Sequence, residues 1–106
     1  MITIEIHKTK GQHSGFISSG HAEYAEEGYD IICAAVSVLT VNAINSIETF
    51  TDDSFAVRQE EGLVELILED TVSKETALLL DSMILGLQEI QKNYGNEYIE
   101  LIFKEV

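Results

Sequence analysis

The sequence predicts an α+β fold, in which a mixed, mostly antiparallel sheet of five strands carries two long helices in the order ββαββαβ. Short segments at the start, middle and end of the chain are rich in alternating or clustered β-branched residues, as strands are. Two segments of about twenty residues instead carry apolar residues three and four positions apart, which is typical of amphipathic helices. Because both helices must bury their apolar faces, the simplest arrangement packs them against one sheet.

The first two strands are predicted to form a hairpin. Isoleucines alternate with polar residues over positions 2–6, so one face of this strand is expected to be buried. Turn-forming residues follow, including Gly11, which can adopt a positive φ. A second strand over residues 14–20 would then return along the first and end beside His21.

A long helix is predicted over residues 31–50. Asp30 precedes it, and aspartate is a preferred N-cap residue. The apolar positions form a broad face, so we expect the helix to be covered on more than one side. The residues expected to be buried are Val36, Leu39, Ala43, Ile47 and Phe50, with Val38, Val41 and Ile44 beside them.

A second hairpin, a second helix and a last strand complete the predicted order. The hairpin strands are expected at 55–58 and 63–68, with a glycine in the turn between them. Ser73 can cap a helix over residues 74–94, and Gly95 is suited to end it. The final strand is expected at 98–103. The buried stripe of this helix is predicted to contain Ala77, Leu80, Ile84, Leu87 and Ile90, with Met83 and Tyr94 alongside.

Length and charge limit the classes of function. A chain of 106 residues has the size of one domain, and we expect residues 1–106 to form a single domain. Six basic against nineteen acidic residues give a net charge of −13. Such a surface repels phosphates, so direct nucleic-acid binding is not expected, whereas a basic protein partner would be attracted. The alternative is that the acidity only keeps a small protein soluble.

A cytoplasmic location without a membrane, cofactor or metal is expected. One cysteine cannot form an internal disulfide, and the charged, alternating N-terminus differs from a signal peptide. The uncharged stretch 31–47 contains several polar residues, which favours a core helix over a membrane span. The sequence has no dinucleotide-binding, Walker or Cys-x-x-Cys motif, and its His and Cys residues lack metal-site spacing.

The segment from residue 20 to 37 contains the candidate chemistry. With Asp30 as N-cap, Cys33 would lie in the first turn of the helix, where unpaired N–H groups and the helix dipole favour a thiolate. The thiolate is the nucleophilic form of cysteine. His21 precedes Cys33 by twelve positions, and a connecting loop of this length can bring it back to the thiol as a general base.

Neighbouring residues would support this chemistry. The N–H groups at the helix N-terminus could stabilise an oxyanion, and Ala34 leaves room for a substrate backbone. Ser37 stands one turn after the cysteine and could hydrogen-bond near the thiol. Asp30 could cap the helix or orient His21, and the sequence does not separate these two roles.

Each of these residues also has a purely structural explanation. A lone cysteine in an apolar helix is usually a small buried hydrophobic residue, and a lone histidine at a strand end is usually incidental. Asp30 is more often a helix cap than a catalytic group. Ser37 is more often a residue that packs or bonds to its own helix backbone.

The same segment carries a resemblance to a known family. The string Gly20-His21-Ala22-x-Tyr24-Ala25-x-x-Gly28-x-Asp30-Ile31-Ile32-Cys33-Ala34-Ala35-Val36-Ser37 closely resembles the Prp family of ribosomal-processing cysteine proteases of Firmicutes and related bacteria. The likeness is specific over about eighteen positions. Outside the motif, only the length, the acidity and the order of elements agree with the family.

The resemblance implies a cysteine endopeptidase that acts on a basic substrate, large-subunit ribosomal protein L twenty-seven, and removes its short N-terminal extension by cutting after an aromatic residue. It implies Cys33 as the nucleophile and His21 as the general base. It also implies a mobile substrate loop over residues 22–29 and a homodimer. Tyr24 and Tyr29 of this loop could line an apolar pocket or anchor the loop on the sheet, and Gly28 could be a hinge or a turn glycine.

Two other functions fit the residues. The first is a non-catalytic acidic module that binds a basic ribosomal protein during ribosome assembly, in which Cys33→Ala would have no effect. The second is a thiol redox sensor, which would respond to peroxide at Cys33, although the chain has no second cysteine to resolve the oxidised form.

Overall fold

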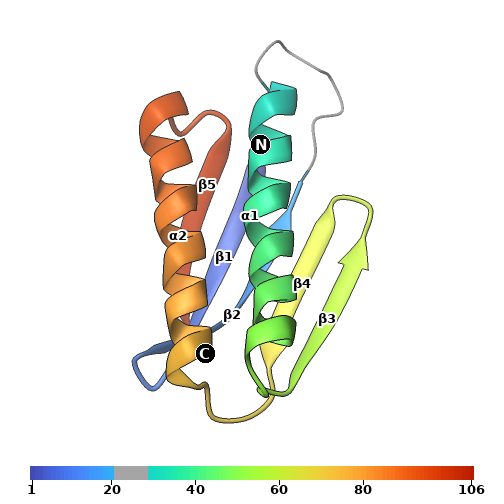
Figure 1. Ribbon diagram of the computed structural model, residues 1–106. Helices are drawn as coiled ribbons and strands as arrows, with labels where there is room; N and C mark the ends of the chain where they lie inside the picture. The colour runs from blue at the N-terminus through green and yellow to red at the C-terminus, as the bar shows by residue number, and fades with distance from the viewer. Residues whose placement is uncertain (21–28) are drawn as a thin grey trace.

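The computed structural model describes residues 1–20 and 29–106, and the elements follow the order ββαββαβ (Figure 1). This order and the α+β class confirm the prediction from the sequence. The elements are β1 (Ile2–Thr9), β2 (Gln12–Ser19), α1 (Tyr29–Phe50), β3 (Phe55–Glu60), β4 (Leu63–Leu68), α2 (Lys74–Tyr94) and β5 (Ile99–Glu105).

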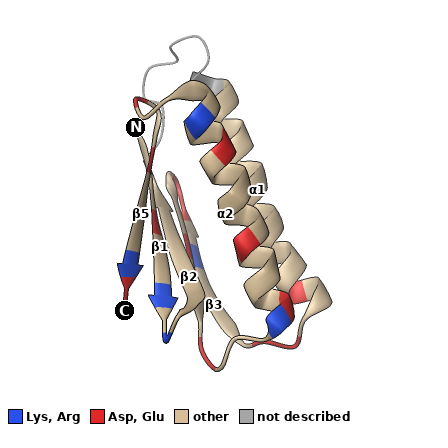
Figure 2. Ribbon diagram, turned by 90° about the vertical axis from the view of Figure 1, so that its left-hand side faces the viewer, with Lys and Arg blue, Asp and Glu red and all other residues tan. Residues whose placement is uncertain are grey.

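The five strands form one mixed sheet in the order β3-β4-β2-β1-β5. Three of the four strand pairs are antiparallel, and the pair β1–β5 is parallel. Both helices lie side by side on one face of this sheet, so the fold has two layers (Figures 1 and 2). Because α2 carries the chain back along the sheet before β5 begins, β5 runs in the same direction as β1.

The alternating isoleucines of β1 set the buried face of the sheet. Ile2, Ile4 and Ile6 are all buried, and the strand register places Phe16 of β2 opposite Ile6 and Leu66 of β4 opposite Phe16. The helices cover this row. The buried apolar helix residues are Ile32, Val36, Ala43, Ile44 and Ile47 of α1 and Leu80, Met83, Ile84 and Leu87 of α2.

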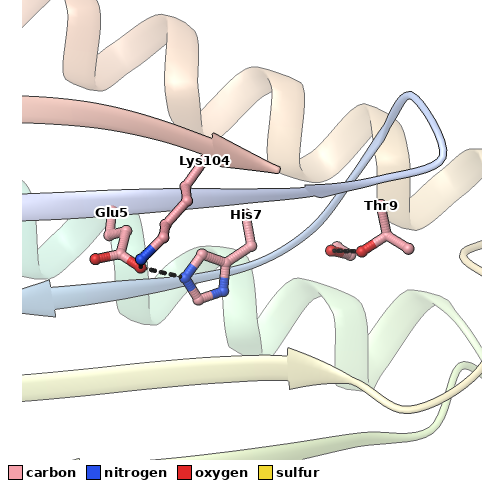
Figure 3. A network of polar contacts seen from close by, with 5 residues as sticks. Glu5, His7, Thr9 and Lys104 are labelled. Carbon is pink, nitrogen blue, oxygen red and sulfur yellow. Dashed lines mark hydrogen bonds and ion pairs between the residues drawn. The ribbon is translucent and has the colours of Figure 1, made fainter. Parts of the chain in front are cut away.

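The opposite face of the sheet is polar along β1. Glu5 and His7 alternate with the buried isoleucines and lie on the face away from the helices (Figure 3). His7 Nε2 lies 2.8 Å from Glu5 Oε1, and Lys104 Nζ of β5 lies 3.8 Å from the same oxygen. The hydrogen bond from His7, aided by the charge of Lys104, holds the pKa of Glu5 below its usual range.

Two residues of helix α1 are more exposed than predicted. Val38 is 66% exposed and Phe50 is 73% exposed, although both were expected to be buried. The sheet and α2 cover only part of the circumference of α1, and Phe50 is the last residue of the helix.

By length and composition the segment Ile31–Phe50 could cross a membrane, yet five of its apolar residues are buried in the core of this domain.

Helix α2 begins and ends where the sequence predicts. The Ser73 hydroxyl oxygen accepts a hydrogen bond from the Thr76 N–H at 3.2 Å, which is the contact expected of an N-cap. Asp53 accepts hydrogen bonds from the N–H and hydroxyl of Ser73 at 3.0 and 2.8 Å. Gly95 ends the helix with a φ of 90°. The predicted burial of Tyr94 is wrong, because this last helical residue is exposed.

Candidate active site

The site begins where β2 ends. Gly20 follows the last residue of β2, and its N–H donates a hydrogen bond to the Gly62 carbonyl in the β3–β4 turn at 3.0 Å. Its φ is 106°, and a Cβ at this position would lie 2.4 Å from the Met1 carbonyl oxygen. Only glycine fits such a backbone without strain. The residue before His21 is therefore held firmly between the N-terminus and the β3–β4 turn.

Cys33 is supplied by the start of α1. The helix begins at Tyr29, earlier than the predicted start at residue 31, so Asp30 is its second residue and not its N-cap. Cys33 is consequently the fifth residue of the helix, one turn after the start. The free N–H groups expected at a helix N-terminus belong to residues 29–32. The Cys33 side chain is half-buried and packs against the hydrophobic core.

A pocket of about 270 Å³ lies between α1 and the strand ends of the sheet. Cys33 and Gly20 both line it, so the predicted nucleophile and the residue before His21 border the same cavity. Among the described residues that line it, most of the others are apolar or carry a hydroxyl group, and Glu60 is the one charged residue. The other lining residues are Ile2, Ser18, Val36, Ser37, Thr40, Val41, Gln59, Gly62, Leu63 and Val64.

The structure brings together three of the residues singled out in the sequence, namely Gly20, Cys33 and Ser37. Ser37 is exposed, and the structure has no hydrogen bond between its hydroxyl and the Cys33 thiol; its carbonyl instead accepts a bond from Thr40 at 3.3 Å. Ala34 is exposed and does not line the pocket.

The other candidate residues fall in or beside the part of the chain that is not described. His21, Tyr24 and Gly28 lie outside the described residues. Tyr29, predicted to end the loop, is the first residue of α1. The prediction of Asp30 as N-cap is wrong because Asp30 lies inside α1, and its orienting role stays a prediction because the side chains of Tyr29 and Asp30 lie outside the described part.

Sequence reasoning missed the wall of the pocket that the β3–β4 hairpin supplies. Gln59, Glu60, Leu63 and Val64 come from a segment well separated from Cys33 in the sequence, and no local pattern relates them to the cysteine. Ser18 was also missed, although a signal for it exists. The alternation of β2 places Ser18 on the same face as the buried Phe16, where a polar residue is unexpected.

Known proteins share both the sequence and the fold of this chain. A family model described as cysteine protease Prp matches residues 1–100. The ribosomal processing cysteine protease Prp of Staphylococcus aureus is 33% identical over 98% of this chain and 100% of its own length. The protein of the same name from Mycoplasma pneumoniae is 32% identical over 85% of this chain and 84% of its own length.

Solved structures of the Staphylococcus aureus protease show the same fold. Its complex with a substrate peptide superimposes with a TM-score of 0.90 at 32% identity, and its complex with a covalently linked product peptide gives 0.87 at 33% identity. Each match covers 98% of this chain and 100% of the other chain. The sequence match over nearly the whole chain and the shared fold lead to one conclusion, that this chain belongs to the Prp family of cysteine proteases.

Proposed function

We propose that this protein removes the N-terminal extension of ribosomal protein L twenty-seven, with Cys33 as the nucleophile and His21 as the general base. The observation that carries the proposal is the pocket at the start of α1, which is lined by the one cysteine of the chain and by Gly20, the residue before His21. The ribosomal processing activity named for the relatives supports a ribosomal protein as the substrate.

The proposed reaction is an acyl transfer through the Cys33 sulfur. His21 takes the thiol proton, and the Sγ attacks the scissile carbonyl to form a tetrahedral oxyanion. The protonated His21 then donates the proton to the leaving amine, which releases the C-terminal fragment and leaves a thioester on Cys33. Water, activated by His21, hydrolyses the thioester and releases the extension. Free N–H groups at the start of α1 are suited to stabilise the oxyanion.

The charge of the protein supports a basic substrate. The net charge is −13, and Glu60 borders the pocket with Glu61 next to it in the β3–β4 turn. Ribosomal proteins are basic because they bind RNA, so long-range attraction would raise the rate of encounter. The same charge disfavours direct binding to nucleic acid. We further propose a cytoplasmic location, for which the single cysteine is the supporting observation.

We also propose that the protein is a homodimer. Helix α1 has no charged residue from position 31 to position 47, and Ile31 and Val38 are exposed on it. Leu78 and Leu85 are exposed on the neighbouring α2. Two acidic chains can meet at an uncharged surface with the least repulsion. Light scattering at micromolar concentration should give twice the chain mass of 11.8 kDa, and a mass near 11.8 kDa would contradict the dimer.

Cleavage of the host's L twenty-seven precursor tests the proposed function. We expect the wild type to cut the precursor at one site after an aromatic residue, which mass spectrometry of the fragments would locate. Cys33→Ala should lower the rate by about 10⁴-fold or more, and His21→Ala by about 10²- to 10⁴-fold. If Cys33→Ala cuts as well as the wild type, the proposed nucleophile is wrong. If the wild type binds the precursor without cutting it, an acidic binding module becomes the better explanation.

A further inference from the structure

Gly20 is held by the sheet on both sides, although it lies one residue beyond the end of β2. On the side of β1, a Cβ at Gly20 would overlap the Met1 carbonyl oxygen and would lie 3.3 Å from the Ile2 Cα. The Ile2 N–H donates a hydrogen bond to the Tyr98 carbonyl at 2.9 Å, so this neighbour of Gly20 is itself tied to the residue before β5.

On the side of β4, the β3–β4 turn makes the contact. Strands β2 and β4 pair antiparallel through Ser19 and Leu63, so Gly20 and Gly62 are the next residues to face each other along the ladder. The Gly20 N–H donates a hydrogen bond to the Gly62 carbonyl at 3.0 Å. This bond extends the β2–β4 ladder by one residue, into the turn itself.

The β3–β4 turn differs in backbone geometry from the β1–β2 turn. Each turn has two residues between paired strand ends, Lys10 and Gly11 in one and Glu61 and Gly62 in the other. Lys10 and Gly11 both have a positive φ, which is the type I′ geometry that two-residue hairpins favour. Gly62 has a φ of 73°, but within residues 1–20 and 29–106 Lys10 is the one non-glycine residue with a positive φ, so Glu61 does not share it. The β3–β4 turn therefore has a less favoured geometry, and the bond from Gly20 is a contact from outside the hairpin that stabilises it.

The place of Gly20 matters because His21 is joined directly to it. Gly20 and Gly62 both line the pocket that contains Cys33. A general base must come within hydrogen-bond reach of the proton that it takes, and a displacement of about 1 Å can lower a rate by about 100-fold. Gly20 has no side chain that could fix its backbone, so its fixed position depends on the bond to Gly62 and on the close approach of Met1.

We propose that Gly62 is a positioning residue, whose carbonyl fixes the Gly20 backbone and thereby sets the place of His21 relative to the Cys33 thiol. This inference rests on the proposed protease function and gives the β3–β4 turn a part in the reaction as well as in the fold. Gly62 acts through the backbone of Gly20, so its loss should lower the rate of the chemical step more than the affinity for the substrate.

Replacing the amide between Ser19 and Gly20 by an ester tests the proposal, because it removes the N–H donor and adds no atom to the pocket. Cys33 is the one cysteine of the chain, so a synthetic segment 1–32 that carries the ester can be joined to residues 33–106 by native chemical ligation. We expect kcat for the L twenty-seven precursor to fall about tenfold to 100-fold. KM should change by less than about threefold. An ester between Lys10 and Gly11, in the turn at the other end of β2, is the matched control and should keep the kcat of the all-amide protein.

A second readout separates positioning from loss of structure. The pH dependence of Cys33 alkylation by iodoacetamide reports the influence of a histidine on the thiol and needs no substrate. We expect the Gly20 ester to move this profile toward that of His21→Ala, whereas the Gly11 ester should keep the profile of the all-amide protein. Circular dichroism should show the two ester proteins melting within about 5 °C of each other.

Two results would overturn the proposal. If the Gly20 ester keeps both the kcat and the alkylation profile of the all-amide protein, the Gly62 carbonyl does not position the base. If kcat falls only in proportion to the folded fraction, the role of the hydrogen bond is structural. Failure of the all-amide protein to cut the precursor would instead refute the proposed function, and the alkylation profiles of the same proteins then decide whether Gly62 positions His21.

Discussion

Replacement of Gly20 by alanine should lower the free energy of unfolding much more than replacement of a glycine that has a positive φ but no close neighbour at its Cβ position. Gly20 combines a φ of 106° with a Cβ position 2.4 Å from the Met1 carbonyl oxygen. A strained backbone conformation costs about 1–3 kcal/mol, and forcing an extra carbon into a packed site costs about 1–3 kcal/mol. We therefore expect a loss of about 3 kcal/mol or more for Gly20→Ala.

Two other glycines separate these contributions. Gly11 has a φ of 80° and nothing within 4 Å of its Cβ position, so Gly11→Ala should cost about 1 kcal/mol. Gly15 lacks the positive φ, but its Cβ would lie 2.3 Å from the Leu66 carbonyl oxygen, and Gly15→Ala should cost about 2 kcal/mol.

Thermal unfolding followed by circular dichroism measures these losses. For a domain of this length, about 1 kcal/mol corresponds to roughly 4–5 °C in Tm. The expected decreases are therefore about 13 °C for Gly20→Ala, about 9 °C for Gly15→Ala and about 4 °C for Gly11→Ala. If Gly20→Ala melts within about 2 °C of Gly11→Ala, the close approach of Gly20 to the N-terminus does not constrain this position.

Three further predictions concern the core, the α2 cap and the charge. Leu87 is fully buried, whereas Gln88 beside it on α2 is exposed. Urea unfolding should therefore show a loss of about 2–5 kcal/mol for Leu87→Ala and less than about 0.5 kcal/mol for Gln88→Ala, and equal losses would contradict the packing of α2. Hydrogen bonds from Thr76 and Ser73 lower the pKa of Asp53 in the folded state. The ionised Asp53 therefore stabilises the fold at pH values above its unfolded pKa of about 4. This stabilisation is lost as the pH falls through the lower pKa of the folded state. Asp53→Asn should make the stability fall less steeply with pH below about 4, and an unchanged pH profile would refute this. Raising the salt from about 0.01 M to about 1 M shortens the Debye length from about 30 Å to about 3 Å. Because this screens the attraction between the acidic protein and a basic substrate, kcat/KM should fall. A kcat/KM that does not change with salt would argue against electrostatic steering.

The order of the elements follows directly from local patterns in the sequence. The alternation of Ile2, Ile4 and Ile6 predicts both the first strand and its buried face, and Ser73 and Gly95 correctly mark the ends of α2. The strand order and the parallel β1–β5 pair are not encoded in any single segment. They depend on which faces the two helices cover, which is a property of the whole chain.

The errors in the burial predictions lie mainly at helix ends. Phe50 and Tyr94 continue the apolar periodicity of their helices but are the last residues of α1 and α2. Val38 is an exception in mid-helix, because the covered part of α1 is narrower than its apolar surface. Periodicity measures where a residue points around the helix axis, and it does not show how far the neighbouring layer extends.

The candidate site could be predicted in part. The segment around Cys33 carries the family motif, so local sequence was enough to single out Cys33 and Gly20, which line the same pocket. The β3–β4 wall of the pocket comes from residues that tertiary packing alone brings to α1. The helix start at Tyr29, which changes the position of Asp30, falls within the ordinary uncertainty of helix ends in sequence reasoning.

The most direct test of the central claim is covalent labelling of Cys33 by a substrate-like electrophile. A peptide that copies the extension of L twenty-seven and ends in a vinyl sulfone at the cleaved position would react with a thiolate held in the site. Intact-mass spectrometry should show one peptide added to the wild type, peptide mapping should place it on Cys33, and the unmodified extension peptide should slow the reaction. Absence of the adduct, or labelling no faster than that of a free cysteine peptide, would contradict Cys33 as the nucleophile of this protease.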